Sequence, residues 1–393
     1  MAGQTTDTNL GPVINILKYM PETFRFAMLR LGKDCNADGS YSFMDAKCSV
    51  SVIRDERKVM MVRNFKKVFK RGIDLMNELK SGDMNSFKNM EKNYKAAIIV
   101  LAKFLEEKEK HEKSLNNVLN RKQNEGDDSC QNTELTVALA EHLLGRLAPR
   151  QSYIIDSRAK RNGRCSCGEK HCVKDPTYGS TGIGHEEVWH GHVDIIFSSH
   201  EGVEPESTGC AVRPLVTDSE TRTNDAEEME DESDGLPSGN TVDEDKQSTI
   251  GAEDQSVAET IVFSLIQRIH HPDLKTHLIP YIVISSCDFR ILMYDADNDV
   301  FLCSMLLPLL QDNCLHITSV LILWMALHYR IFCSGIDIDP KEIDRVQSKF
   351  RNIVGEKWEI YSKSLKLGAA NFPVVSKNTF PSNEDILLGT ELF

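Results

Sequence analysis

The chain has 393 residues, of which 40% are hydrophobic, so it can form two or three domains with substantial cores and is not a disordered chain. Its formal net charge is −13, but residues 201–254 alone hold 17 acidic and 3 basic side chains. The acidity therefore belongs to one segment. It neither indicates nor excludes a nucleic-acid partner for the rest of the chain.

The thiols and the apolar runs predict an intracellular protein, cytoplasmic or nuclear. Eleven cysteines are an odd number, and no apolar signal segment follows the first methionine, so we expect reduced thiols rather than a disulfide framework. The most apolar run, 319–327, has nine residues, whereas a membrane-spanning helix needs about 20. We expect a buried helix there and no contact with a membrane.

The first 125 residues predict a helical arm. Residues 12–31 and 55–122 have apolar side chains at three- and four-residue spacing, without the alternation of a strand. The longest piece, about 83–123, is charged on most faces in its second half. This pattern favours a helical hairpin or coiled coil, through which the protein could self-associate or bind a protein partner. Residues 34–52 between the helices predict a loop or short hairpin.

A basic segment lies within this arm. Residues 54–71 contain eight Lys and Arg side chains and two acidic ones, together with a stripe of buried apolar positions. The solvated face of an amphipathic helix is one interpretation, and a face that contacts phosphate is the other.

An α/β domain is expected from residue 133 onward. Thr133 can cap a helix over 134–147, which stops before Pro149. A cysteine-rich loop, 165–172, then leads into two strands.

The rest of this domain is interrupted by an acidic insert over residues 201–241. Its composition cannot bury enough surface to offset the chain entropy, so we expect 217–241 to be disordered, although 210–216 could be one short strand. The elements expected around the insert are strands 186–190, 192–198 and 281–286, helix 255–270, a hairpin of 289–294 and 299–303 that turns on 295–298, and helices 315–332 and 340–357. This order describes a mixed α/β sheet with flanking helices, formed by residues 133–200 plus 242–360, and 361–393 are expected to be a C-terminal tail.

Asp194 is the first candidate for chemistry. It stands in a run of β-branched and aromatic residues, 189–197, where an unpaired carboxylate is costly to bury. Hydrogen bonding, a position at a sheet edge or a metal ion would each account for it. Strand alternation puts Asp194 on the same side as His192 and Ile196.

The cysteine-rich loop is the second candidate. Cys165, Cys167 and Cys172 offer thiolates, which together with imidazole are the ligands that Zn²⁺ prefers. His171 is adjacent to Cys172 and cannot easily bind the same ion, so His185 or His190 is the candidate for the fourth ligand. The loop therefore predicts either a structural zinc site or a set of reduced thiols.

The order of elements in the C-terminal half resembles the PD-(D/E)XK nuclease superfamily, which has a restriction-endonuclease-like fold. That pattern is a helix, a strand with Asp, a strand with Glu-x-Lys, a helix and a further strand. The matching segments here are helix 134–147, the strand with Asp194, Glu244-Asp245-Lys246, helix 255–270 and strand 281–286. Residues 258–267, 281–285 and 293–300 are also similar to a set of invertebrate proteins with a nuclease-like C-terminal half, and the resemblance covers 133–335.

The resemblance implies a hydrolase that cleaves the phosphodiesters of DNA or RNA with Mg²⁺ or Mn²⁺. Asp194 would be the first metal ligand and Glu244 the second. Lys246 would be the general base or an electrostatic helper, and Glu141 on the preceding helix would supply an additional acid.

The residues leave a second possibility open. The segment 239–250 has only Val242 and Ile250 as apolar support for a strand around Glu244. If 210–216 is the central strand instead, Arg213 is its only charge, and the expected acid and lysine are absent. The domain would then be an inactive nuclease-like scaffold that serves as a protein interaction module.

Overall fold

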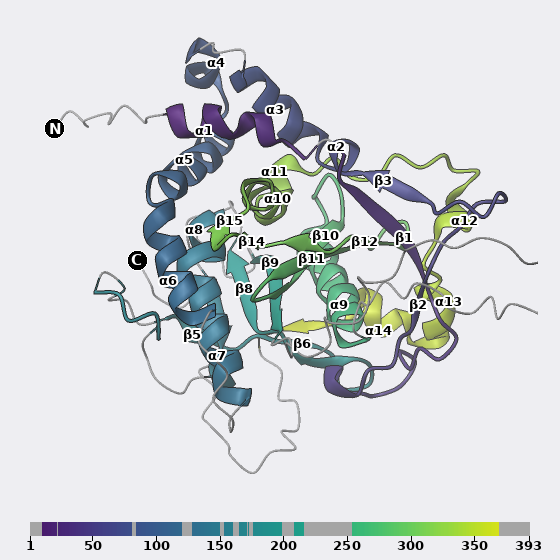
Figure 1. Ribbon diagram of the computed structural model, residues 1–393. Helices are drawn as coiled ribbons and strands as arrows, with labels where there is room; N and C mark the ends of the chain where they lie inside the picture. Colours follow the sequence, from purple (N-terminus) through teal and green to yellow (C-terminus); the bar gives the residue numbers. More distant parts are fainter. Residues whose placement is uncertain are drawn as a thin grey trace, which may run out of the picture.

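A computed structural model of the chain describes residues 10–21, 23–80, 84–119, 128–149, 153–159, 165–170, 172, 176–198, 208–215 and 254–368. The protein has the expected mixed α/β class. The main strands are β1 (Arg25–Leu31), β2 (Val50–Val52), β4 (Tyr153–Asp156), β5 (Tyr178–Gly179), β8 (Ile195–Ser198), β9 (Thr208–Leu215), β10 (Leu278–Ser285), β11 (Asp288–Asp295) and β12 (Val300–Ser304). They form one sheet in the order β2-β1-β12-β11-β10-β9-β8-β4-β5 (Figure 1).

The half of the sheet that carries the candidate site consists of β4, β8, β9 and β10. β4 pairs with β8 and β8 with β9 in antiparallel fashion, and the helix α9 (Asp254–His270) then crosses over to β10, which is parallel to β9. Helix α7 (Asp128–Leu139) precedes these strands. The neighbour of β8 is thus β9, the short strand that the sequence left as an alternative to the Glu244 segment.

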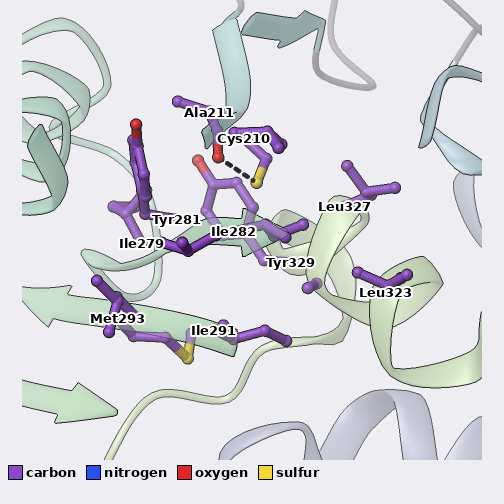
Figure 2. Packing of buried hydrophobic residues seen from close by; sticks show 14 of the residues in the cluster. Cys210, Ala211, Ile279, Tyr281, Ile282, Ile291, Met293, Leu323, Leu327 and Tyr329 are labelled. Atoms are coloured by element: carbon purple, nitrogen blue, oxygen red, sulfur yellow. Dashed lines mark hydrogen bonds between the residues drawn. The ribbon is translucent and has the colours of Figure 1, made fainter. Parts of the chain in front are cut away.

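Helices cover both faces of this half-sheet. Every residue of β10 is buried, which explains why 278–285 reads as a continuous apolar run rather than as an alternation. Tyr281 reaches α9, because its hydroxyl donates a hydrogen bond to Glu259. Figure 2 shows Ile282 beside Tyr329, near Leu327, on the side of α10 (Ile317–Leu327) and α11 (Tyr329–Phe332).

The N-terminal region is not a separate helical arm. Residues 12–31 were expected to be helical, but only α1 (Gly11–Ile16) and a 3₁₀ turn (Leu17–Tyr19) are, and β1 joins the main sheet against β12. Five of the seven residues of β1 are buried, including four in succession. Side chains on both faces of the strand are therefore buried, and the sequence lacks the alternation that identifies a half-exposed strand. The hydrophobic core therefore extends from the N-terminal region into the α/β domain.

The long helices of the N-terminal region lie on the body of the protein. α5 (Lys92–Glu106) and α6 (Lys108–Leu119) run along one side, where Figure 1 shows them beside α7. The indole nitrogen of Trp324 donates to the carbonyl of Ala97 at 3.0 Å, and the Tyr94 and Phe332 rings stack at 6.2 Å. These contacts fix α5 to α10 and α11, whereas a projecting arm would leave that face exposed.

The strand pair expected over 186–198 is arranged differently. β7 (His190–His192) pairs with β6 (Gly182–Gly184) in a small sheet with β16 (Lys366–Leu367), and only β8 enters the main sheet. The hairpin of β11 and β12 forms as expected, because Asp295 accepts hydrogen bonds from the amides of Asp297 and Asn298 in the turn.

The remaining elements are short. They are β3 (Val62–Asn64), β13 (Leu307–Pro308), β14 (Leu310–Gln311), β15 (Cys314–Leu315), α2 (Phe65–Val68), α3 (Lys70–Lys80), α4 (Met84–Asn89), α12 (Ile343–Val346), α13 (Phe350–Val354) and α14 (Trp358–Lys363). Within the described ranges, no helix combines the length and the apolar character that crossing a bilayer requires. The stretch 217–241, expected to be disordered, lies outside the described residues, as do residues 369–393. The first part of the expected tail, 361–368, instead belongs to the fold, because it contains the end of α14 and the strand β16, which pairs with β6.

Candidate functional site

Three cysteines of the 165–172 loop meet a histidine from the preceding helix. The Sγ atoms of Cys165, Cys167 and Cys172 and a ring nitrogen of His142 all lie within 4.8 Å of one another. Four such ligands around Zn²⁺ would be about 3.7 Å apart, given Zn–S and Zn–N bonds of about 2.3 and 2.0 Å in a tetrahedron. The group could therefore hold a metal ion such as zinc.

An irregular helix turn presents His142. The helix that starts as α7 widens into a π-helical turn over Ala140–Leu144 and ends as α8 (Gly145–Leu147). The amide of Gly145 donates to the carbonyl of Ala140, five residues earlier, and a Cβ at this glycine would stand 2.2 Å from that oxygen. The wide turn carries His142, with its Nε2 3.4 Å from the Sγ of Cys165. Such π turns often occur at functional sites.

Polar contacts hold the cysteine loop against α6. Gly168 adopts a left-handed conformation (φ +75°), and the amide of Cys172 then donates to the carbonyl of Glu169 at 3.0 Å, which turns the third thiol back toward the first two. Asn117 of α6 donates to the carbonyl of Cys167 at 2.9 Å, and Lys113 pairs with Glu169 at 2.8 Å. The loop conformation thus places its three thiols on one side.

The thiols of Cys165 and Cys172 are expected to lose their protons only when a metal cation binds. Burial raises the pKa of Cys165 well above its ordinary value, and burial and the nearby Cys167 raise the pKa of Cys172 to about 11. Both are therefore thiols at neutral pH when no cation is close. Zn²⁺ binds thiolates, so metal binding here would release protons.

His185 and Glu141 do not lie where the sequence analysis expected them. His185, one of the two expected candidates for the fourth zinc ligand, accepts a hydrogen bond from the amide of Glu187 at 3.2 Å in the turn after β6, and His142 takes its position in the cluster. Glu141 accepts a hydrogen bond from Tyr153 and pairs with Arg146 at 3.5 Å. Its charge helps to raise the pKa of Cys172, so Glu141 lies beside the metal cluster rather than serving Asp194.

A second constellation lies between the sheet and α9. β8 and β9 pair so that Ile195 is opposite Val212. Asp194 was expected inside the strand but lies immediately before β8, and the charge of Arg213 on β9 acts on it. Burial, and after it the negative charge of Glu259, raise the pKa of Asp194 to about 7 against the opposite effect of Arg213. Asp194 is therefore close to half-protonated at neutral pH.

Glu259 supplies the second carboxylate of this group, from the middle of α9. Its side chain is fully buried. Gln255 donates to Oε1 at 2.8 Å and Arg213 donates to the same oxygen at 3.3 Å, while the hydroxyl of Tyr281 donates to Oε2. Both oxygens are thus engaged by donors of the protein itself. This satisfies a buried charge that would otherwise be strongly unfavourable.

The remaining predicted site residues, Glu244 and Lys246, lie outside the described residues. The strand beside Asp194 carries Ala211 and Arg213 at the two-residue spacing at which the resemblance expects an acid and a lysine. The arginine keeps a positive charge next to Asp194, and the acid comes from α9 instead.

Comparisons with known proteins add nothing to this geometry, since no family model, curated protein or solved structure matches the chain.

The sequence analysis missed His142, Glu259 and the role of Arg213. A lone acid inside the apolar run 257–266 was a usable signal for Glu259, because an acid on a buried helix face needs a partner. His142 gave no such signal, since it is brought to the cysteines from 23 positions away by packing of the helix against the loop.

Proposed function

We propose that this protein is a zinc-binding scaffold on a nuclease-like α/β core, and that it acts by binding rather than by hydrolysing phosphodiesters. The observation that carries the proposal is the state of Glu259. Its two carboxylate oxygens accept hydrogen bonds from Gln255, Arg213 and Tyr281 within the fold.

A hydrolytic Mg²⁺ site needs carboxylate oxygens that are free to bind the ion. Mg²⁺ loses its water reluctantly and requires near-octahedral oxygen ligands. To use Glu259, the ion would have to displace a guanidinium and a tyrosine hydroxyl from a fully buried carboxylate. Asp194 alone is a poor site for a divalent cation, because the positive charge of Arg213 lies within electrostatic reach of it.

Zinc has a structural role in this proposal. An ion held by His142 and the three cysteines would join the 165–172 loop to the π turn that precedes β4. A site with four protein ligands has no open position for a substrate, which is the usual arrangement of a structural zinc site.

The test is a cleavage assay on labelled single- and double-stranded DNA and RNA with Mg²⁺ or Mn²⁺. Wild type is compared with Asp194→Asn, which keeps the size of the side chain and removes its charge. The proposal predicts no cleavage by the wild type above that of the variant. Metal-dependent cleavage that Asp194→Asn abolishes would overturn it.

A metal-dependent phosphodiesterase is the second candidate, and one observation favours it. The carboxylates of Asp156 and Glu259 both raise the pKa of Asp194, so three acids lie within electrostatic reach of one another and of Arg213. Carboxylic acids whose pKa is shifted in this way often mark catalytic sites. The same assay decides between the candidates, since only this one predicts cleavage.

A further inference from the structure

A pocket lined by three arginines lies at the β2 edge of the sheet, at the opposite end of the strand order from the cysteine cluster. Its volume is about 240 Å³, and its lining residues are Arg30, Ser51, Val52, Ile53, Arg54 and Arg345. Arg30 belongs to β1, Ser51 and Val52 to β2, and Arg345 to α12. Arg54 follows β2, so the three arginines of the lining come from β1, from the segment after β2 and from α12.

Among the residues that the structure describes, the positive charge of this pocket is poorly compensated. Arg30 donates to the carbonyl of Arg345 at 2.8 Å, and Arg54 donates to the carbonyl of Lys58 at 3.0 Å. A carbonyl oxygen orients a guanidinium without neutralising it. Glu56 is the carboxylate that pairs with Arg345, at 3.1 Å, and it is 85% exposed, so water weakens that pair.

The guanidinium group of Arg30 has a hydrogen-bond donor that the fold does not use. Among the described residues its Nε is buried without a hydrogen-bond partner, although buried donors are normally satisfied. The hydroxyl of Ser51 lies on the same lining. The pocket thus combines fixed cations, an unsatisfied N–H and a hydroxyl, with Val52 as an apolar wall.

We propose that this pocket binds a phosphate group, in the form of inorganic phosphate or the phosphomonoester of a small molecule. A phosphate dianion matches two or three guanidinium groups in charge and accepts paired N–H bonds in the geometry that arginine offers. The neighbouring segment, residues 54–71, carries eight basic and two acidic side chains and adds to the positive field. The inference does not depend on zinc or on Asp194.

The test is titration calorimetry of the full-length protein with inorganic phosphate and, separately, with ribose 5-phosphate. Arg54→Gln and Arg345→Gln are each expected to weaken binding about tenfold, because each removes a charge-assisted contact. Glu56→Gln is expected to tighten binding about twofold, since it releases Arg345 from its carboxylate. Lys363→Gln, which removes one charge from an exposed side chain on α14, is the control and should bind like wild type.

The variants keep the proposal falsifiable even if Arg30 is needed for folding, because Arg54 and Arg345 are exposed. Tighter binding of ribose 5-phosphate than of inorganic phosphate would support the phosphomonoester as the ligand, and equal binding would support free phosphate. No binding of either probe, or binding that Lys363→Gln weakens as much as Arg54→Gln, would overturn the proposal. So would a requirement for a 5′-phosphorylated oligonucleotide, which would indicate a nucleic-acid site instead.

Discussion

At the scale of single residues, the sheet cluster shows how burial and charge together set a protonation state. The sequence predicts that the carboxylate of Asp194 would be costly to bury unpaired. The positive charge of Arg213 on the next strand favours the charged form of Asp194, whereas burial and the negative charge of Glu259 on α9 favour the protonated form. The spacing of residues in the sequence could not predict which charged groups surround Asp194. The partners of Asp194 come from β9 and α9, which only the pairing of β8, β9 and β10 brings together.

The raised pKa predicts a specific pH dependence of stability. An unfolded Asp titrates near 3.8 and folded Asp194 at about 7, so its contribution to stability is fully present below pH 4 and is lost as the pH rises through 7. We expect Asp194→Asn to gain about 3 kcal/mol relative to wild type between pH 4 and pH 8. Urea unfolding across this range measures the difference. Parallel stability curves would contradict the prediction, and Asp344→Asn, at an exposed position, controls for loss of a charge.

At the scale of elements, the best predictions were those with a clear local signal. Helix α9 and the hairpin of β11 and β12 lie where apolar spacing and the turn residues at 295–298 put them. β1 was missed, because a strand buried on both faces does not alternate. The cysteine loop was predicted to be either a zinc site or a set of reduced thiols, and its geometry could hold a metal ion. The expected histidine was His185 or His190, since the π turn that carries His142 has no sequence signature.

The π turn gives a prediction of its own. In Gly145→Ala the new methyl group would meet the carbonyl oxygen of Ala140 at 2.2 Å and the ring of Tyr153 at 2.9 Å, so the turn must shift. We expect a loss of about 1–3 kcal/mol in stability and weaker zinc retention against a chelator. Gly39→Ala is the matched control, because the three atoms nearest its methyl group would all belong to the ring of Tyr41, which is 43% exposed and can turn away. Unchanged zinc retention in Gly145→Ala would show that the turn does not position His142.

At the scale of the whole molecule, the main departure from the sequence analysis is the domain organisation. A helical arm followed by an α/β domain was expected, because residues 12–31 and 55–122 have helical spacing. The structure instead places β1 in the same sheet as β12, with α5 packed on α10 and α11. Contacts between residues about 275 positions apart in sequence leave no local trace, so spacing alone could not predict them.

One sheet implies one cooperative unfolding unit. Met28 is fully buried in β1, whereas Met44 is 85% exposed, and all three tryptophans, at 189, 324 and 358, lie outside the N-terminal 125 residues. We expect Met28→Lys to lower the stability reported by tryptophan fluorescence by about 3 kcal/mol or more, because it buries an unpaired charge. Met44→Lys should have little effect. If Met28→Lys left the tryptophan transition unchanged, the N-terminal region would be an independent unit.

The most direct test of the zinc-bound scaffold is the metal content of the purified protein, measured by inductively coupled plasma mass spectrometry. We expect about one zinc ion per chain in the wild type and in His185→Ala, and little zinc in His142→Ala and Cys167→Ser, because only the latter two remove a member of the cluster. A wild type free of zinc after purification and after exposure to zinc would contradict the account. So would a His142→Ala variant that keeps a full equivalent.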